Sequence, residues 1–482
     1  MSLELKFHER VVIRRGFVKR MNVVIVSVML SIAGAIVLFT KVVHPVSSIP
    51  KMALILCSSA GSDLTVTSST QLDPNCTYTG HFNITASNVF FDCRGAMIDG
   101  VGKSGIGIEV SVPANADLSN VTIDNCIVKG FTNGMRITRV GFRSLQAGAE
   151  YVNGISGVLI ENSKIIDSSG AGLYIDAYVT HTTVNKVSLL GDGSTGMYLE
   201  AGSMDNVVEN SVFLDNGYVS NGPYWQAVPG LNNVWWWGTG REGLAIDGSR
   251  NNIIKGNKFQ GNSAGGIFLY KNCGEDVNSQ PQSWFPRRYD SSNNLIENNT
   301  FTGGVDGVWI GSRMSQDVEP LDCSESSYIS GKLFDIKLDH APNNTVLNNT
   351  FYDVAYGVRI EDNGTRVIGN KFYGGSNANY AVVVGTRYRT SMLSEPVSGT
   401  SIIDNISNIP NPSPYRWIYG QVDSKFQNNS SLNLFANWCP GKDLPLDPLL
   451  FVEAVRAGAS GGGVPPPPNP TPAVVGTQTP CS

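Results

Sequence analysis

Acidic side chains recur at one position of a short repeated segment, four residues after its first glycine. The position holds Asp176, Glu200 and Asp247 in three successive repeats. If these repeats stack as strands, neighbouring carboxylates lie about 5 Å apart and next-nearest ones about 10 Å apart. These separations bracket the spacings of the two carboxyl groups in retaining and inverting glycosidases. Close carboxylates also repel each other, which raises the pKa of one of them and supplies a proton donor.

The same three carboxylates have two alternative roles. Asp176, Glu200 and Asp247 could together bind Ca²⁺, which prefers oxygen ligands. No other cofactor is suggested by the sequence. The three acids could also form ion pairs with lysine or arginine and take no further part in function.

Basic side chains gather in the later repeats of a chain whose net charge is −5. An acidic polymer such as a uronan would be attracted to this basic surface. The alternative is that the cations only form ion pairs with Glu361, Asp362 and an acidic loop. The basic residues are Lys271, Arg287, Arg288, Arg313 and Arg359.

Breaking a uronan by β-elimination requires a cation at the C6 carboxylate, a base at C5 and an acid at the leaving oxygen. We expect Arg313 or Arg359 to neutralise the carboxylate. Lys271 is the expected base, provided that neighbouring arginines lower its pKa. Tyr270 or Tyr198 is the expected proton donor, and the catalytic set is therefore centred on Tyr270 and Lys271.

The segments that carry these residues share the pattern glycine, apolar, any residue, apolar, often polar. Apolar residues on either side of a variable one indicate a short strand with one buried face. Most segments follow a second apolar run, such as those at Asn294 and Asn344, so each repeat contains two strands closed by turns. Such a unit predicts one coil of a parallel β-helix, in which equivalent positions lie above one another. The segments begin at Gly134, Gly172, Gly196, Gly243, Gly266, Gly307, Gly357 and Ala381.

Two columns of side chains are predicted to point outward from these strands, because the apolar residues point inward. One column is rich in aromatic rings, which are costly to expose to water. Rings suit the apolar faces of sugars and acids bind their hydroxyl groups, so we expect a carbohydrate-binding face. The alternative is that loops cover the rings as a second core. The residues expected to bind substrate are Tyr174, Tyr198, Glu200, Asp247, Phe268, Trp309, Glu361, Arg287 and Arg288.

Asparagines recur at turns between the strands, and long loops interrupt the later coils. Inward asparagines can hydrogen-bond their counterparts in neighbouring coils, which predicts a structural ladder. Loops over residues 217–240, 272–292 and 313–342 leave from one corner, where loops of a solenoid usually wall a binding groove. The ladder positions are Asn125, Asn162, Asn210, Asn257, Asn299, Asn349 and Asn370.

The composition favours strands and excludes some functions. The 52 glycines and many short β-branched runs favour strands and turns over helical repeats. Charged residues make up 16% of the chain and the net charge is −5, so no bulk electrostatic argument supports nucleic acid as a partner.

The N-terminal region predicts a membrane anchor. Residues 21–40 are apolar over about 20 residues, the length that spans a bilayer as a helix. Basic residues in segment 1–20, among them Arg14, Arg15 and Arg20, predict a cytoplasmic N-terminus and an extracellular or periplasmic remainder. The alternative is a cleaved signal peptide, but no small-residue cleavage site follows, which favours a single-pass signal-anchor.

The 8 cysteines fit an oxidising compartment. Cys93 and Cys126 occupy the same position in consecutive repeats, so we expect them to pair. Cys273 and Cys323 could join two long loops, and elimination leaves Cys57 with Cys76 and Cys439 with Cys481. Buried free thiols are the alternative.

The chain ends in a different composition from the repeats. Apolar residues near 446–456 have helical spacing and predict a short cap over the last coil, and the Pro/Gly-rich end predicts a disordered tail. The expected organisation is a cytoplasmic segment at 1–20, a transmembrane helix at 21–40, a lead-in at 41–81, a parallel β-helix at 82–430, a cap at 431–458 and a tail at 459–482.

Over residues 82–406 the glycine-strand and asparagine pattern resembles the right-handed parallel β-helix proteins of the pectate-lyase-like superfamily. It looks most like the polysaccharide lyases and mannuronan C5-epimerases. The resemblance implies an all-β, right-handed, single-stranded solenoid with a long groove that acts on uronate-containing polysaccharides. Glycosidases and adhesins share the fold, so the chemistry stays open.

One departure from that family bears on the reaction. The epimerases carry an Asp-Pro-His motif on a glycine strand, whereas the segment ending at Asp247 lacks it. His181 and His340 are the only histidines in the coil region beyond its first turn. Lysis is therefore favoured over epimerisation.

We expect a membrane-anchored, outward-facing lyase that acts on an acidic polysaccharide. The alternatives are a noncatalytic glycan-binding or surface-layer protein, and a glycoside hydrolase or C5-epimerase on the same fold. An accessory factor for an exported metalloenzyme is disfavoured, because the outward columns lack clusters of histidine, methionine and cysteine.

Overall fold

The structure is a computed structural model that describes residues 52–431 except for 103, 219–223, 227–233, 237–240, 272–284, 286, 312–313, 317–327, 331–334, 339, 376, 386–395 and 419–421. Several predictions from the sequence concern residues outside this set. They are the segment at 1–20, the transmembrane helix at 21–40, the cap and the tail, and the pairs Cys273–Cys323 and Cys439–Cys481. Arg313 also lies outside it. In the described part of the chain, no helix combines the length and the apolar character that a bilayer crossing requires.

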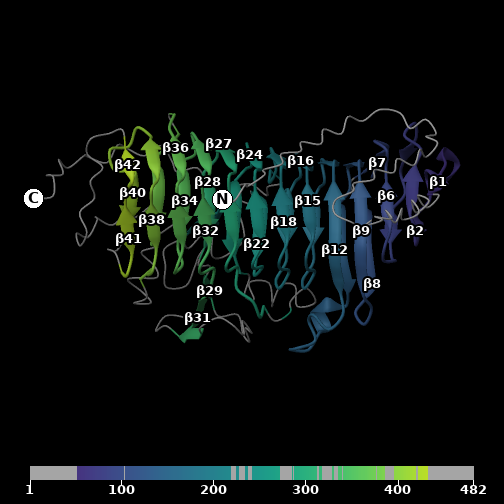
Figure 1. Cartoon of the computed structure of the whole chain (residues 1–482), viewed down its shortest axis with the longest axis horizontal. Helices are drawn as coiled ribbons and strands as arrows, with labels where there is room; N and C mark the ends of the chain where they lie inside the picture. The colour runs from purple at the N-terminus through teal and green to yellow at the C-terminus, as the bar shows by residue number, and fades with distance from the viewer. Residues whose placement is uncertain are drawn as a thin grey trace, which may run out of the picture. The chain divides into compact units, whose positions relative to one another are not determined.

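Three parallel sheets run side by side, and each coil of the chain contributes one strand to each sheet. Strands follow one another in chain order within every sheet, as the colour sequence of Figure 1 shows. The all-β parallel β-helix expected from the repeats is therefore confirmed. The stacked strands begin at Ala53, earlier than the predicted start at residue 82.

Sheet 1 consists of β1 (Ala53–Ile55), β3 (Thr70–Leu72), β6 (Phe90–Asp92), β9 (Leu118–Asp124), β12 (Ile155–Glu161), β15 (Thr183–Asn185), β18 (Val207–Glu209), β23 (Ile253–Lys255), β26 (Leu295–Glu297), β32 (Thr345–Leu347), β35 (Arg366–Ile368), β38 (Ser401–Ile403) and β41 (Lys425–Gln427). Sheet 2 consists of β4 (Thr77–Tyr78), β7 (Met97–Asp99), β10 (Ile127–Lys129), β13 (Lys164–Ile166), β16 (Ser188–Leu190), β19 (Val212–Leu214), β24 (Lys258–Gln260), β27 (Thr300–Thr302), β33 (Thr350–Tyr352), β36 (Lys371–Tyr373), β39 (Ile406–Asn408) and β42 (Ser430–Ser431).

Sheet 3 carries the glycine strands: β2 (Leu64–Val66), β5 (Phe82–Ile84), β8 (Ile106–Pro113), β11 (Asn133–Val140), β14 (Leu173–Ile175), β17 (Met197–Leu199), β22 (Glu242–Asp247), β25 (Gly265–Tyr270), β28 (Asp306–Ile310), β34 (Tyr356–Ile360), β37 (Tyr380–Val384) and β40 (Tyr415–Trp417). The remaining elements are the strands β20 (Tyr224–Gln226), β21 (Val234–Trp236), β29 (Met314–Gln316), β30 (Tyr328–Ser330) and β31 (Asp335–Leu338), and the 3-10 helices η1 (Cys57–Ser59) and η2 (Phe142–Ser144).

The repeated glycine is required by close packing inside the solenoid. A Cβ on Gly307 would lie 2.5 Å from Phe351 Cε1 and 2.6 Å from the carbonyl oxygen of Gly357. Phe351 belongs to a row of stacked rings in which neighbouring centroids lie 4.5 to 5.0 Å apart. The repeat therefore uses glycine so that the backbone of sheet 3 can meet this row. The stacked rings are Phe213, Phe259, Phe301, Phe351 and Phe372.

A buried asparagine ladder joins the later coils, as predicted. The Asn257 side-chain amide donates to Asn299 Oδ1 at 3.0 Å, and Asn299 donates in the same way to Asn349. The ladder continues through Asn370 and Asn405. Each amide thereby satisfies buried groups in the next coil.

Three of the predicted ladder positions are wrong. Asn125, Asn162 and Asn210 are exposed and have φ values of 54°, 50° and 52°. They occupy the left-handed turn position one residue earlier, which asparagine tolerates well. In the early coils the ladder position is held by hydroxyls instead, since Ser163 Oγ accepts from Cys126 N and Ser211 Oγ accepts from Val187 N.

Two of the expected disulfides are present. Cys93 pairs with Cys126 across adjacent coils, with Cα atoms 4.8 Å apart, and Cys57 pairs with Cys76, with Cα atoms 5.3 Å apart. Both join the first coils, where the open end of the solenoid has the fewest neighbouring strands to hold it.

Candidate functional site

The register of sheet 3 brings the predicted outward column together. Tyr174 pairs with Tyr198, Tyr198 with Ala245, and Ala245 with Phe268. The column continues through Trp309 to Arg359. Side chains separated by up to 185 positions in the sequence (359 − 174) thus lie in one line.

The expectation that this column is open to solvent is wrong. Tyr198 is 8% exposed, and Phe268 and Trp309 are each 2% exposed. Their rings form a second apolar cluster with Ala264, Val305 and other residues on the outer side of sheet 3. The reason is the cost of exposing stacked rings, so the alternative of a second core describes this part of the molecule.

The acid row is present, and arginines neutralise it. Two nitrogens of Arg136 bind Asp176, with Nη2 at 2.9 Å from Oδ2. Burial raises the pKa of Asp176 to about 6, although Arg136 acts in the opposite direction. Arg287 Nη1 forms an ion pair with Glu200 and lies 3.5 Å from Asp247 Oδ2.

The protonation states of Glu200, Tyr174 and Tyr198 follow from their surroundings. Burial alone would raise the pKa of Glu200, but Arg287 and the hydrogen bond from Tyr174 hold it below its usual value. The Tyr198 hydroxyl donates to Asp247 Oδ2 at 2.7 Å. Burial and the nearby carboxylates raise the pKa of both phenols well above 10.0. The carboxylate of Glu200 is therefore an anion and the phenols of Tyr174 and Tyr198 are protonated donors.

The sequence predicted a catalytic role for Tyr270 but not the residues that bind its hydroxyl. Its hydroxyl donates to Glu242 Oε1 at 2.9 Å and accepts from Arg241 Nη2 at 2.7 Å. Glu242 and Arg241 were missed because they precede Gly243, the residue at which the repeat was taken to begin. A third outward column was the available signal, since Asp306 and Tyr356 precede their glycines in the same way.

A separate ionic cluster lies further along the column. Arg359 Nη2 lies 3.0 Å from Asp306 Oδ2, and Arg359 Nε lies 3.7 Å from Glu361 Oε1. The guanidinium also stacks near the rings of Trp309 and Tyr356. Burial raises the pKa of Asp306 to about 7, against the opposing effect of Arg359. A cavity of about 10 Å³ beside Asp306 has the size of one water molecule, far too small for a sugar.

Two predicted cations face away from these clusters. Lys271 is fully buried, and its Nζ lies 2.8 Å from Asp290 Oδ1. Burial raises the pKa of Asp290, although Lys271 lowers it. Arg288 Nη1 pairs with Glu150 Oε1 at 3.2 Å and lies 3.4 Å from the Tyr178 hydroxyl. Arg288 therefore ties the chain after β25 to earlier coils, whereas Lys271 pairs with an acid of the same segment.

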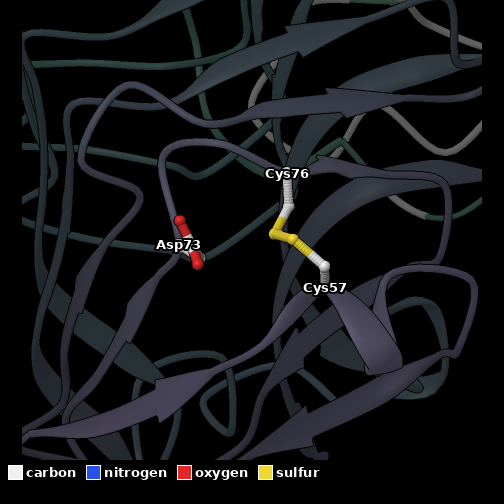
Figure 2. A group of neighbouring side chains, drawn as sticks. All are labelled: Cys57, Asp73 and Cys76. Atoms are coloured by element: carbon white, nitrogen blue, oxygen red, sulfur yellow. A yellow bond between two sulfur atoms is a disulfide. The ribbon is translucent and has the colours of Figure 1, made fainter.

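The three carboxylates proposed for Ca²⁺ do not gather as metal ligands. In the described part of the chain, the only group of three histidine, cysteine or acidic side chains with ligand spacing is Cys57, Asp73 and Cys76. Figure 2 shows that the two sulfurs of this group form a disulfide, so they are not available as thiolate ligands. Asp73 Oδ1 instead accepts from the backbone and side chain of Asn75.

The comparisons with known proteins agree with this architecture. The family described as "Right handed beta helix region" matches residues 55–280. The chain is a right-handed parallel β-helix protein. The right-handed β-helix fold implied by the resemblance is thereby confirmed. A second family, "Periplasmic copper-binding protein (NosD)", matches residues 230–406. Among the described residues in that range, no three histidine, cysteine or acidic side chains lie at ligand spacing.

Solved structures that match the chain at low identity include an alginate lyase and two epimerases. An alginate lyase from Paenibacillus sp. str. FPU-7 is 12% identical, with a TM-score of 0.37, over 77% of this chain and 99% of the lyase. The A-module of the Azotobacter vinelandii mannuronan C-5 epimerase AlgE6 is 13% identical, with a TM-score of 0.43, over 78% and 92%. The periplasmic alginate epimerase AlgG is 11% identical, with a TM-score of 0.43, over 79% and 77%. No curated protein matches the chain. These likenesses say nothing about what this chain binds or converts.

Proposed function

We propose that this chain is an extracytoplasmic protein that cleaves an acidic polysaccharide by β-elimination, with the outer side of sheet 3 as its site. The observation that carries the proposal is the Tyr270 hydroxyl, which is held between Arg241 and Glu242 beside the arginine-neutralised acid row. A phenol between a cation and a carboxylate can both take and give a proton. A neighbouring cation for the C6 carboxylate completes the requirement.

Arg287 is the side chain best suited to bind that C6 carboxylate. It already binds two carboxylate groups, Glu200 and Asp247, and Asp247 is the register partner of Tyr270 on the neighbouring strand. A uronate would replace one of these carboxylates, because both are acids of the same charge and geometry. Arg359 and Arg313 remain candidates for a further sugar carboxylate. Lys271 is less suited as the base, because Asp290 binds its ammonium group.

The aromatic column supplies the sugar contacts in this proposal. Tyr174 and Tyr198 stack with ring centroids 4.9 Å apart, and Phe268 and Trp309 meet edge to face at 5.2 Å. The rings of Tyr198, Phe268 and Trp309 are buried in the free protein and that of Tyr174 is partly buried, so polymer binding must displace the residues that pack over them. Arg287 binds the two carboxylates that accept from the Tyr174 and Tyr198 hydroxyls, and only 12% of its side chain is exposed.

An extracytoplasmic location is supported by two observations. Both described disulfides require an oxidising compartment. The family matched over residues 230–406 is described as periplasmic. The apolar segment at 21–40 would anchor the chain in the membrane, with the β-helix outside.

The proposal is tested by incubating the full chain with alginate, pectate, glucuronan and hyaluronan. Elimination yields an unsaturated uronate, which absorbs near 235 nm (roughly, a property of the product chromophore) and appears together with new chain ends. New reducing ends without this absorbance would contradict elimination and indicate hydrolysis, for which D247N would be the damaging substitution. A changed uronate epimer ratio without cleavage would indicate a C5-epimerase.

A noncatalytic glycan-binding or surface-layer protein is the second candidate function. It is favoured by the burial of the acid row and its neutralisation by Arg136 and Arg287, which leaves Asp176 and Glu200 stably paired. Retention of a polysaccharide on the immobilised protein, with no product after long incubation, would support this candidate and overturn the lyase.

A further inference from the structure

Tyr270 is buried, at 1% exposure, in the apolar cluster on the outer side of sheet 3, and its hydroxyl bonds Glu242 and Arg241 there. The register places Tyr270 beside Asp247, whereas its hydroxyl binds Glu242 at the other end of β22. Ala245, the register neighbour of Phe268 and the smallest side chain in a column otherwise rich in large ones, lies on β22 between Glu242 and Asp247.

Arg241 and Glu242 form a fixed polar support for the hydroxyl. Arg241 Nε lies 3.3 Å from Glu242 Oε2, and Arg241 Nη2 lies 3.3 Å from Glu242 Oε1. Burial would lower the pKa of Arg241, but Glu242 and Tyr270 raise it well above the usual value for arginine, so the guanidinium stays charged. The carboxylate can accept a proton from the phenol, and the guanidinium stabilises negative charge on the phenol oxygen.

We propose that Glu242 and Arg241 are positioning residues that make the Tyr270 hydroxyl the carrier of the proton in the elimination. This inference rests on the proposed function and deepens it. Neither residue needs to touch the substrate, since both act through Tyr270.

The proton movements balance without any further reagent. The Tyr270 oxygen takes the proton from C5 of the uronate while its own proton passes to Glu242 Oε1. The electrons of the C5–H bond form the C4=C5 double bond, and the C4–O bond to the leaving sugar breaks. The leaving oxygen then takes a proton from Tyr270, and Glu242 returns its proton to the phenol. Both side chains end as they began.

The test compares wild type with E242Q, the charge-balanced double variant R241Q/E242Q, and E242D. We expect kcat to fall about 100-fold in both glutamine variants, as for loss of an acid–base group, with KM within about threefold. The acid limb of the pH–rate profile should disappear in both, and E242D should restore part of kcat. E209Q, which changes a partly exposed acid paired with Lys255 on sheet 1, serves as the matched control.

Each outcome has a defined meaning. If the wild type is active and both E242Q and R241Q/E242Q keep its kcat and the acid limb of its pH–rate profile, the proton relay is overturned but the proposed function is not. A loss of kcat that only follows a lower unfolding midpoint, without a change in the pH–rate profile, also overturns it. A wild type that forms no unsaturated product overturns the proposed function and the relay together.

Discussion

At the scale of single residues, Arg287 is the key contact of the candidate site. Its guanidinium lies between Glu200 and Asp247, two buried acids on neighbouring coils. Removing one partner of a buried ion pair leaves the other charge uncompensated, which usually costs more than the pair itself contributes. The stability of this face and its ability to hold a uronate therefore depend on the same side chain.

R287M is expected to lower the free energy of unfolding by about 3–5 kcal/mol, because it leaves Glu200 and Asp247 buried without their ion pair to Arg287. Chemical denaturation of wild type and variant measures this loss. K255A is the control, since Lys255 is 42% exposed and pairs with Glu209 at the surface. The control should lose less than about 1 kcal/mol. Equal losses in the two variants would contradict the role of Arg287.

Asp306 should make the protein less stable as the pH rises. Burial raises its pKa from 3.8 to about 7 in the folded chain, so the folded state binds this proton more tightly than the unfolded state. The resulting stabilisation is complete below pH 3.8 and is lost as the pH rises through about 7. Each unit of pKa shift corresponds to about 1.4 kcal/mol.

D306N is therefore expected to flatten the dependence of the unfolding midpoint on pH between 3.8 and about 7. Thermal unfolding across this range gives the measurement. Burial also raises the pKa of Asp176 to about 6. Its effect on the pH dependence of stability is the same in wild type and D306N, so it does not alter the difference between them. A variant with an unchanged pH dependence would show that Asp306 is ionised in the folded chain at neutral pH.

At the scale of the strand and coil, glycine determines how closely sheet 3 approaches the interior. G307A is expected to lower the free energy of unfolding by about 1–3 kcal/mol, because the new methyl group overlaps Phe351. G61A is the control, since the nearest atom to its added Cβ is Thr79 Oγ1 at 3.8 Å. Denaturation of both variants provides the measurement, and a G307A protein as stable as G61A would contradict this explanation of the repeat.

Strands and their stacking could be predicted from the sequence because each repeat encodes the same turn and the same apolar positions. The pairing of Tyr174 with Tyr198 and of Cys93 with Cys126 follows directly from that periodicity. The role of each asparagine in the turn was harder to predict, because Asn125 and Asn257 look equivalent in sequence but occupy adjacent positions of the turn. One adopts a left-handed conformation and the other points inward, and asparagine suits both.

At the scale of the whole solenoid, alternation predicts which face a side chain points to, but not what covers that face. Tyr198 and Trp309 point outward as expected, yet both are buried. They pack in one cluster with Ala264, Val305 and Tyr356, which lie outside the two columns predicted from the glycine segments, so those columns alone did not reveal the cover. Glu242 was missed for a different reason, because strict alternation from Leu244 would place it inside although it faces Tyr270.

The central claim is that the outer side of sheet 3 cleaves an acidic polysaccharide through Tyr270. The most direct measurement is the formation of unsaturated uronate by wild type, Y270F and Y373F on the polymers named above. Tyr373 stacks on Tyr352 on sheet 2, so Y373F removes a hydroxyl of the same kind from another face. We predict product from wild type and Y373F and at least a 100-fold (roughly) slower reaction in Y270F. Equal rates in the two variants, or no product from wild type, would contradict the account.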